Sequence, residues 1–153
     1  MMICGQRHTD DLNLADKISQ VKEENILKNP DFHNWGSSII KGEDGKYHLF
    51  YAQMSKKIGF KSWLTDGVVS HATSDHPAGP YVHQEIVLEG RGPGHWDAYT
   101  AHNPRIKFFD GKYYLYYMST NTGDWKFTEE EFQQARSQGI PNQFRSIVRM
   151  NQR

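Results

Sequence analysis

Cysteine is almost absent from this chain of 153 residues, which contains Cys4 alone. A single thiol cannot form a disulfide within one chain, so we expect a fold without that cross-link. Long apolar runs are missing too, and no segment approaches the ~20 residues that span a membrane. The N-terminus lacks the basic and apolar regions of a signal peptide. We therefore expect no membrane partner, and the localisation stays open between the cytoplasm and export within a longer protein.

The chain also lacks net charge, because 18 Lys and Arg side chains balance 18 Asp and Glu side chains. The basic residues form no continuous stripe along the sequence. Such a stripe is the electrostatic signature of proteins that bind nucleic acids or anionic membranes. The sequence therefore predicts neither of these partners.

Aromatic residues and glycine, in contrast, are abundant. Phe, Trp and Tyr make up 13% of the chain, and there are 13 glycines. This combination favours a β protein with many turns and a ligand surface built from rings. The length is that of one ordinary domain.

One motif occurs twice, at residues 39–52 and again at 105–118, with an offset of 66 residues. The shared positions are Ile40, Lys41, Asp44, Gly45, Lys46, Tyr47, Leu49 and Tyr51 in the first copy, and Ile106, Lys107, Asp110, Gly111, Lys112, Tyr113, Leu115 and Tyr117 in the second. Each copy has the pattern of a β-hairpin with an Asp-Gly turn. A repeated unit of this kind is typical of the blades of a β-propeller.

We therefore predict an all-β fold made of propeller blades, each a four-stranded antiparallel meander. Residues 1–29 form an irregular lead-in, and residues 30–153 form a partial propeller. The first blade covers about 36–88, and the second, which is incomplete, covers about 101–153. Open sheet edges expose unpaired backbone groups, so we expect self-association through them.

A short helix is expected as an insertion in the second blade, near residues 128–137. Thr128 is a good N-cap residue, and Glu129, Glu130 and Glu131 place negative charge in the first helical turn. Gly139 and Pro141 would end the helix.

The offset of 66 residues also carries Asp31 onto Asp97. Equivalent residues of neighbouring blades approach each other where the first strands converge on the propeller axis. Paired carboxyl groups are what glycosidic bond hydrolysis uses, so Asp31 and Asp97 are the candidate catalytic residues. The alternative is that each aspartate caps a turn that enters a blade.

Four further residues are candidates for binding a sugar: Trp35, His95, Trp96 and His102. A Trp ring can pack on the C–H face of a sugar, and an imidazole can hydrogen-bond a hydroxyl group. Packing between blades would explain the same side chains equally well. We find no phosphate-binding loop, zinc spacing or nucleophile elbow, so we expect no cofactor and assign no metal ligand, although a metal ion on the propeller axis stays an open alternative.

Three segments carry a resemblance to a known family. They are Trp35 to Tyr51, Ser70 to Tyr81 with the pattern A-T-S-D-x-P-x-G-P-Y, and His102 to Tyr117 with the pattern x-N-P-x-I…D-G-K-Y-Y-L-Y-Y. Together they resemble the five-bladed propeller glycoside hydrolases of family 43 and its relatives, over about residues 29–121. The resemblance implies that Asp31 is near the position of the catalytic base and Asp97 near that of a second aspartate that orients and tunes. It implies a glutamate acid on a later blade, beyond Arg153.

The sequence thus predicts a glycoside hydrolase-like domain for plant or algal saccharides, present as a truncated and weakly active or inactive piece. One alternative is a non-catalytic carbohydrate-binding or assembly module. Another is a propeller phosphorylase, which would need phosphate-binding basic residues in the funnel.

Overall fold

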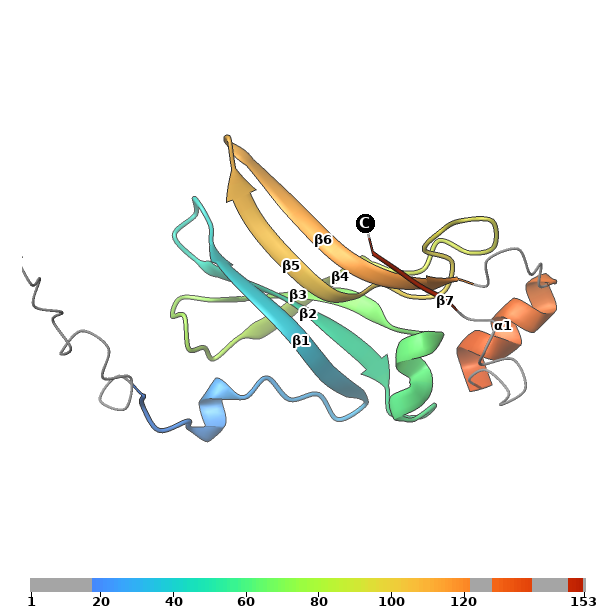
Figure 1. Cartoon of the computed structure of the whole chain (residues 1–153). Helices are drawn as coiled ribbons and strands as arrows, with labels where there is room; N and C mark the ends of the chain where they lie inside the picture. Colours follow the sequence, from blue (N-terminus) through green and yellow to red (C-terminus); the bar gives the residue numbers. More distant parts are fainter. Residues whose placement is uncertain (1–17, 122–127, 139–148, 153) are drawn as a thin grey trace, which may run out of the picture.

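The structure is a computed structural model that describes residues 18–121, 128–138 and 149–152. Two antiparallel β-sheets packed against each other form the body of the molecule (Figure 1). Cys4 and the expected strand at 144–148 lie outside the described residues. Within the described part, no helix has the length and apolar character needed to cross a membrane.

The first sheet is a four-stranded meander. Its strands are β1 (Phe32–Lys41), β2 (Tyr47–Ser55), β3 (Val68–Ser74) and β4 (Val82–Leu88), in the order β1-β2-β3-β4. Each strand pairs with its sequence neighbour in antiparallel fashion. The predicted all-β class, with a four-stranded antiparallel meander as its unit, is confirmed.

The second sheet contains β5 (His102–Phe109), β6 (Lys112–Asn121) and β7 (Arg149–Gln152), in the order β5-β6-β7. The helix α1 (Glu129–Gln138) lies between β6 and β7 in the chain, as the sequence predicted. Thr128 caps it in a reciprocal capping box, because its Oγ1 accepts from Glu131 N at 3.2 Å and Glu131 Oε2 accepts from Thr128 N at 2.9 Å.

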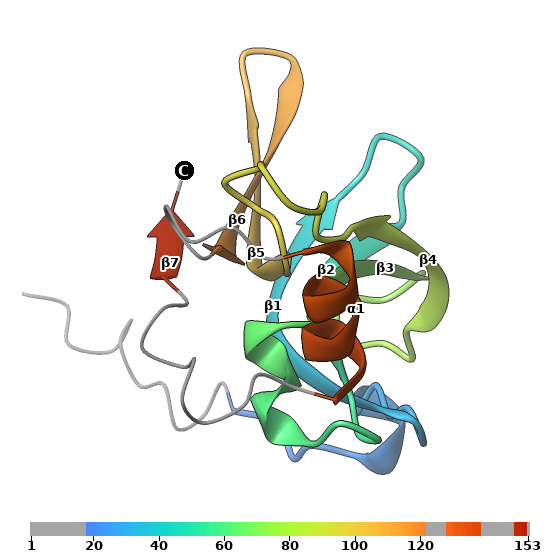
Figure 2. The ribbon, with the colours of Figure 1, turned by 90° about the vertical axis from the view of Figure 1, so that its right-hand side faces the viewer.

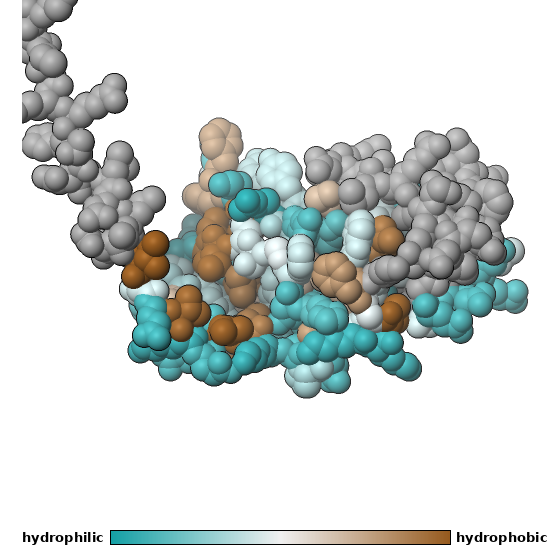
Figure 3. All heavy atoms as spheres, turned by 60° about the horizontal axis from the view of Figure 1, so that its bottom comes forward, coloured by the Kyte–Doolittle hydropathy of each residue, from teal (hydrophilic) through white to brown (hydrophobic). Residues whose placement is uncertain are grey.

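Two short 3-10 helices complete the described elements. The first, η3 (Glu23–Asn25), lies in the lead-in segment before β1, and the second, η4 (Phe60–Leu64), connects β2 to β3. From the underside the described surface is mostly hydrophilic, with its hydrophobic spots gathered near the entry of the N-terminal segment (Figure 3). That segment includes the exposed side chains of Ile18, Val21 and Ile26.

The two copies of the repeat have different lengths on the two sides of the turn. Tyr47 pairs with Lys41 in the first hairpin, and Tyr113 pairs with Phe108 in the second. The offset is therefore 66 residues in the second strand of each hairpin but 67 in the first strand. The second turn is one residue shorter, and this corrects the uniform offset that the sequence indicated.

A second change of length restores the offset before β5. The pairs are His33 with Met54 and Trp35 with Ala52 in the first sheet, and the Tyr99 N to Thr120 O hydrogen bond of 3.2 Å and His102 with Met118 in the second. The segment 99–102 is thus one residue longer than 33–35. Upstream of it the offset is 66 again, which is the value that aligns Asp97 with Asp31.

Both first strands contain a bulge at the same place. The register shifts between Trp35 and Ser38 in β1, and between His102 and Arg105 in β5. Inside each bulge one residue has a positive φ, +44° at Gly36 and +50° at Asn103. The two bulges touch, since a Cβ atom on Gly36 would lie 2.7 Å from Asn103 Oδ1. Glycine is required here both for its φ and for this close approach.

The hydrophobic core of the first sheet contains Leu49, Tyr51 and Ala72, against which Leu27 and Tyr81 pack. Leu27 belongs to the lead-in, so this segment contributes to the core of the sheet.

Polar contacts join the two sheets, which pack as Figure 2 shows from the side. Ile106 N donates to Ser38 Oγ at 3.2 Å, Ala101 N donates to Gly67 O at 2.8 Å, and Thr120 Oγ1 donates to Leu64 O at 2.7 Å. Because these groups are buried or partly buried, each bond avoids the cost of an unpaired polar atom. The interface is therefore specific in its register.

Candidate functional site

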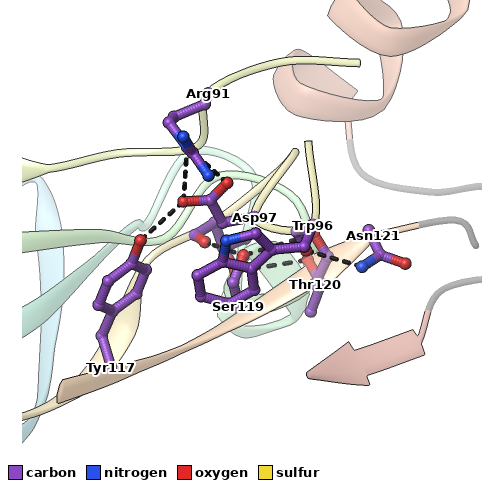
Figure 4. A network of polar contacts seen from close by, with 8 residues as sticks. Arg91, Trp96, Asp97, Tyr117, Ser119, Thr120 and Asn121 are labelled. Atoms are coloured by element: carbon purple, nitrogen blue, oxygen red, sulfur yellow. Dashed lines mark hydrogen bonds and ion pairs between the residues drawn. The ribbon is translucent and has the colours of Figure 1, made fainter. Parts of the chain in front are cut away.

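The carboxylate of Asp97 is the centre of a buried polar network (Figure 4). Asp97 is only 1% exposed. Arg91 Nε donates to both of its oxygens, at 2.7 and 2.8 Å, and Tyr117 OH donates to Oδ2 at 2.7 Å. Arg91 comes from the loop after β4 and Tyr117 from β6, so the carboxylate links the two sheets.

The loop that holds Asp97 closes on itself through the backbone. Arg91 N donates to Asp97 O at 2.9 Å, and Gly92 N donates to Ala98 O at 3.0 Å. Gly90 is needed in this loop, because a Cβ atom there would lie 2.4 Å from the backbone of Tyr99. The loop therefore fixes the position of Asp97 before any side-chain contact is made.

The network keeps Asp97 ionised. Burial by itself would raise the pKa of the carboxyl group, but the hydrogen bonds from Tyr117 and Arg91 outweigh it, and the pKa lies below its ordinary value. Burial and the contact with Asp97 together raise the pKa of Tyr117 to about 12. Tyr117 is thus a stable donor, and Asp97 has the charge state of a base or of an orienting group, not that of a general acid.

Trp96 and His95 lie beside this network. The ring of Trp96 packs on Tyr117 with centroids 5.4 Å apart, and its carbonyl oxygen accepts from Asn121 Nδ2 at 2.7 Å. His95 is exposed, and its backbone N donates to Gly92 O at 3.4 Å. Of these two sequence candidates, Trp96 belongs to the Asp97 network and His95 lies on the loop surface.

A separate cavity of about 340 Å³ opens between the two sheets. Its lining is mostly apolar and aromatic and consists of Trp35, Ala52, Met54, Phe60, Trp63, His102, Asn103 and Met118. Trp35, which is half exposed, packs edge-on against Phe60 at a centroid distance of 5.4 Å. Two of the candidate residues, Trp35 and His102, thus come together here. They occupy equivalent places in the repeat, since each is the last paired residue before its bulge.

His102 provides this cavity with an unsatisfied polar atom. The residue is 4% exposed, and its Nε2 has no hydrogen-bond partner in the described part of the chain. The indole of Trp63 packs edge-on against its ring at a centroid distance of 5.7 Å. Burial lowers the pKa of His102, so the imidazole is neutral near pH 7. A neutral imidazole can donate or accept one hydrogen bond at that atom.

Asp31 lies apart from both groups. It is exposed at the start of β1, where its N donates no bond to the candidate residues but to Asn29 Oδ1, at 2.9 Å, and its O accepts from Lys56 N at 2.9 Å. These contacts are those of a turn that enters a strand. Asp31 and Asp97 therefore have the same place in the repeat but different surroundings, and no contact joins their carboxyl groups.

Metal ligation has no counterpart in the described residues. Among them, no three His, Cys, Asp or Glu side chains gather as a metal site would require. The assignment of ligands to an axial metal ion therefore has no support from this part of the chain.

Sequence reasoning missed four residues of these two groups. Arg91 was taken for an ordinary loop residue, Tyr117 for sheet packing, and neither Phe60 nor Trp63 was selected. Their contacts are made across the fold, because η4 reaches the cavity from between β2 and β3. The available signal was the Trp-containing segment between two predicted strands.

Comparison with known proteins gives partial structural matches. No protein-family model matches the chain, and no curated protein matches it. Among solved structures, a family 117 glycoside hydrolase produced by the marine bacterium Zobellia galactanivorans is 30% identical, with a TM-score of 0.47, over 54% of this chain and 24% of that one. The GH43_1 enzyme from Xanthomonas citri complexed with xylose is 20% identical, with a TM-score of 0.38, over 76% of this chain and 25% of that one.

The complex of the same Xanthomonas citri enzyme with xylotriose gives an equivalent match, 20% identical over 76% of this chain and 26% of that one, with a TM-score of 0.38. The chain thus spans about a quarter of the length of these structures. The resemblance to propeller glycoside hydrolases that the sequence predicted is confirmed as a partial structural match.

Proposed function

We propose that this chain is a saccharide-binding part of a glycoside hydrolase-like propeller, and that its cavity between the two sheets holds a sugar ring. The observation that carries the proposal is the cavity of about 340 Å³ with aromatic walls and one unpaired polar atom, His102 Nε2. Ligand sites have this character, a mostly apolar hollow of ~300–1,000 Å³ with few polar groups that fix orientation.

The lining matches the two kinds of surface that a sugar presents. Trp35, Phe60 and Trp63 offer ring faces and edges to its C–H groups. His102 Nε2 and the Asn103 side chain offer hydrogen bonds to its hydroxyl groups. No charged side chain lines the cavity, which favours a neutral saccharide.

Binding rather than hydrolysis is the activity that we propose for the chain by itself. The residues lining the cavity include no Asp or Glu, whereas hydrolysis requires two carboxyl groups around the scissile bond. Hydrolysis of plant or algal saccharides stays a proposal for a protein with further blades. There, the ionised Asp97 would suit the orienting aspartate that the family resemblance implies, and Asp31 would be the base.

Titration of the chain with neutral oligosaccharides, xylotriose included, tests the binding proposal by the change in tryptophan fluorescence. We expect saturable binding that Trp35→Ala and His102→Ala each weaken about tenfold, as expected for a residue at the centre of a binding site. Trp96→Ala is the matched control and should bind normally, because Trp96 packs on Tyr117 outside the cavity. Equal binding by all of these variants would contradict the proposal.

Hydrolysis is tested separately with aryl-glycosides. We expect little or no turnover by the present chain. If turnover occurs, Asp97→Asn and Asp31→Asn must both reduce kcat for the paired-carboxylate mechanism to hold. Activity that survives both substitutions would remove these residues from the mechanism.

A further inference from the structure

One face of the β5–β6 hairpin carries a regular ladder of cations and rings. Three cross-strand pairs alternate along it, each with one basic and one aromatic residue: Arg105 with Tyr116, Lys107 with Tyr114, and Lys112 with Phe109. Alternate residues of a strand face the same side, so all six side chains project from one face. All six residues are exposed. Figure 2 shows the far end of this hairpin standing clear of the first sheet.

The cations on this face lack partners. Among the described residues, no hydrogen bond or ion pair engages the side chains of Arg105, Lys107 or Lys112. Residues 102–121 contain a single acidic residue, Asp110, which is in the turn. The face is therefore positive although the whole chain is neutral. The basic residues alternate with aromatic ones in the sequence and come from two strands, which is why no stripe is visible along the chain.

The repeat shows that these charges are a departure from the shared pattern. In the first hairpin, the positions equivalent to Arg105, Lys107 and Tyr116 hold Ser38, Ile40 and Phe50. No charged residue stands at these three places in the first copy, and Ser38 there bonds to the backbone of the second sheet. In the second copy, charge has replaced side chains suited to sheet packing.

We propose that this cation–aromatic ladder binds an anionic saccharide chain, one that carries sulfate or carboxylate groups. The cations meet the acidic groups, and the rings of Phe109, Tyr114 and Tyr116 pack on the sugar faces between them. This site is separate from the cavity, so it extends the proposed function without depending on it.

The spacing of the charges favours a saccharide over a nucleic acid. Cations at every second residue are about 7 Å apart along the strand, whereas a nucleic acid strand carries a phosphate about every 3.4 Å. The ladder thus suits a polymer of lower charge density. A symmetric contact with a second copy is disfavoured because it would bring like charges face to face.

The test is a titration of the full chain with a sulfated galactan oligosaccharide, a uronate oligosaccharide and a neutral galactan of equal length. We expect binding of one or both acidic probes, weakened by salt because the contact is exposed, and no binding of the neutral probe to this face. The double variant Arg105→Gln with Lys107→Gln should weaken binding about tenfold, in line with two exposed charge contacts.

Matched variants separate this site from general effects of charge and of folding. Lys28→Gln with Lys57→Gln removes the same charge elsewhere and should leave binding unchanged. Tyr114→Leu with Tyr116→Leu keeps the apolar volume, and it should weaken binding without changing the salt dependence. Retention of the far-ultraviolet circular dichroism of the parent shows that each variant is folded.

Several results would overturn the proposal. These are equal binding of the neutral and acidic probes, acidic-probe binding that the hairpin variants do not weaken, preference for single-stranded oligothymidine over both acidic saccharides, or a change of oligomeric state in the variants without any saccharide binding. Loss of xylotriose binding in the Trp35→Ala variant leaves this site intact, so the failures of the two proposals can be told apart.

Discussion

Asp97 is the residue on which most polar contacts between the two sheets depend. Its carboxylate accepts hydrogen bonds from Arg91 and from Tyr117 while being almost completely buried. A charged acceptor with such partners stabilises a fold more than a neutral one does. Asp97 therefore contributes to stability whether or not it takes part in chemistry.

We expect Asp97→Asn to lower the free energy of unfolding by about 2 kcal/mol, because the amide weakens the bonds to both donors. Tyr117→Phe should cost about 1 kcal/mol through loss of one of them. Asp31→Asn is the matched control, expected within about 0.5 kcal/mol of the parent, since Asp31 is exposed. Urea unfolding measures all three. A larger loss from Asp31→Asn than from Asp97→Asn would refute this assignment.

The pH dependence of stability follows from the same carboxylate. The pKa of Asp97 is lowered by folding, so its stabilising effect is complete above the unfolded value of about 4 and is lost as the pH falls through the folded value. The parent should therefore lose stability below about pH 4 more steeply than the Asp97→Asn variant. Unfolding curves over an acidic pH series measure the two slopes, and parallel slopes would count against the network.

His102 gives a second pH effect at a different range. Burial lowers its pKa, so the unfolded chain binds a proton more readily than the folded one, and stability falls as the pH drops below about 6.5. In His102→Leu this part of the loss should disappear, although His71, whose pKa burial also lowers, keeps its own share. Thermal unfolding between about pH 7 and pH 5 measures the difference.

At the scale of elements, the two bulges fix how β1 and β5 approach each other. Gly36→Ala should destabilise by about 2 kcal/mol, since φ is +44° and the new Cβ would meet Asn103 Oδ1 at 2.7 Å. Gly45→Ala is the control, because φ there is +82° but no atom lies within 4 Å. It should cost about 1 kcal/mol from strain alone. Equal losses on denaturation would show that the contact between the bulges is unimportant.

The hairpins and the capped helix could be predicted because their signals are local. The Asp-Gly turns, the alternation of strand residues and the Thr128 cap each act over a few residues. The Asp97 network and the cavity could not, because Arg91, Trp63 and Tyr117 reach their places only when two sheets have packed. The sequence grouped Trp35 with Asp31 and His102 with Asp97, whereas packing brought Trp35 and His102 together.

At the scale of the molecule, the two sheets are held together by buried hydrogen bonds as much as by apolar contact. Ile106 N donates to Ser38 Oγ, and Thr120 Oγ1 donates to Leu64 O. We expect Ser38→Ala to cost about 1–2 kcal/mol, because it leaves a buried N–H unpaired. Unfolding followed by tryptophan fluorescence and by circular dichroism should give one coincident transition. Two separate transitions would show that the sheets fold independently.

The paired length changes around β5 have a consequence for engineering by hairpin grafting. Since neighbouring residues of a strand face opposite sides, shifting a strand by one position exchanges its inner and outer surfaces. In this chain the residue gained in 99–102 is cancelled by the residue lost at the next turn. A chimera that transplants one hairpin must therefore carry both alterations together, because either one alone would turn β5 inside out.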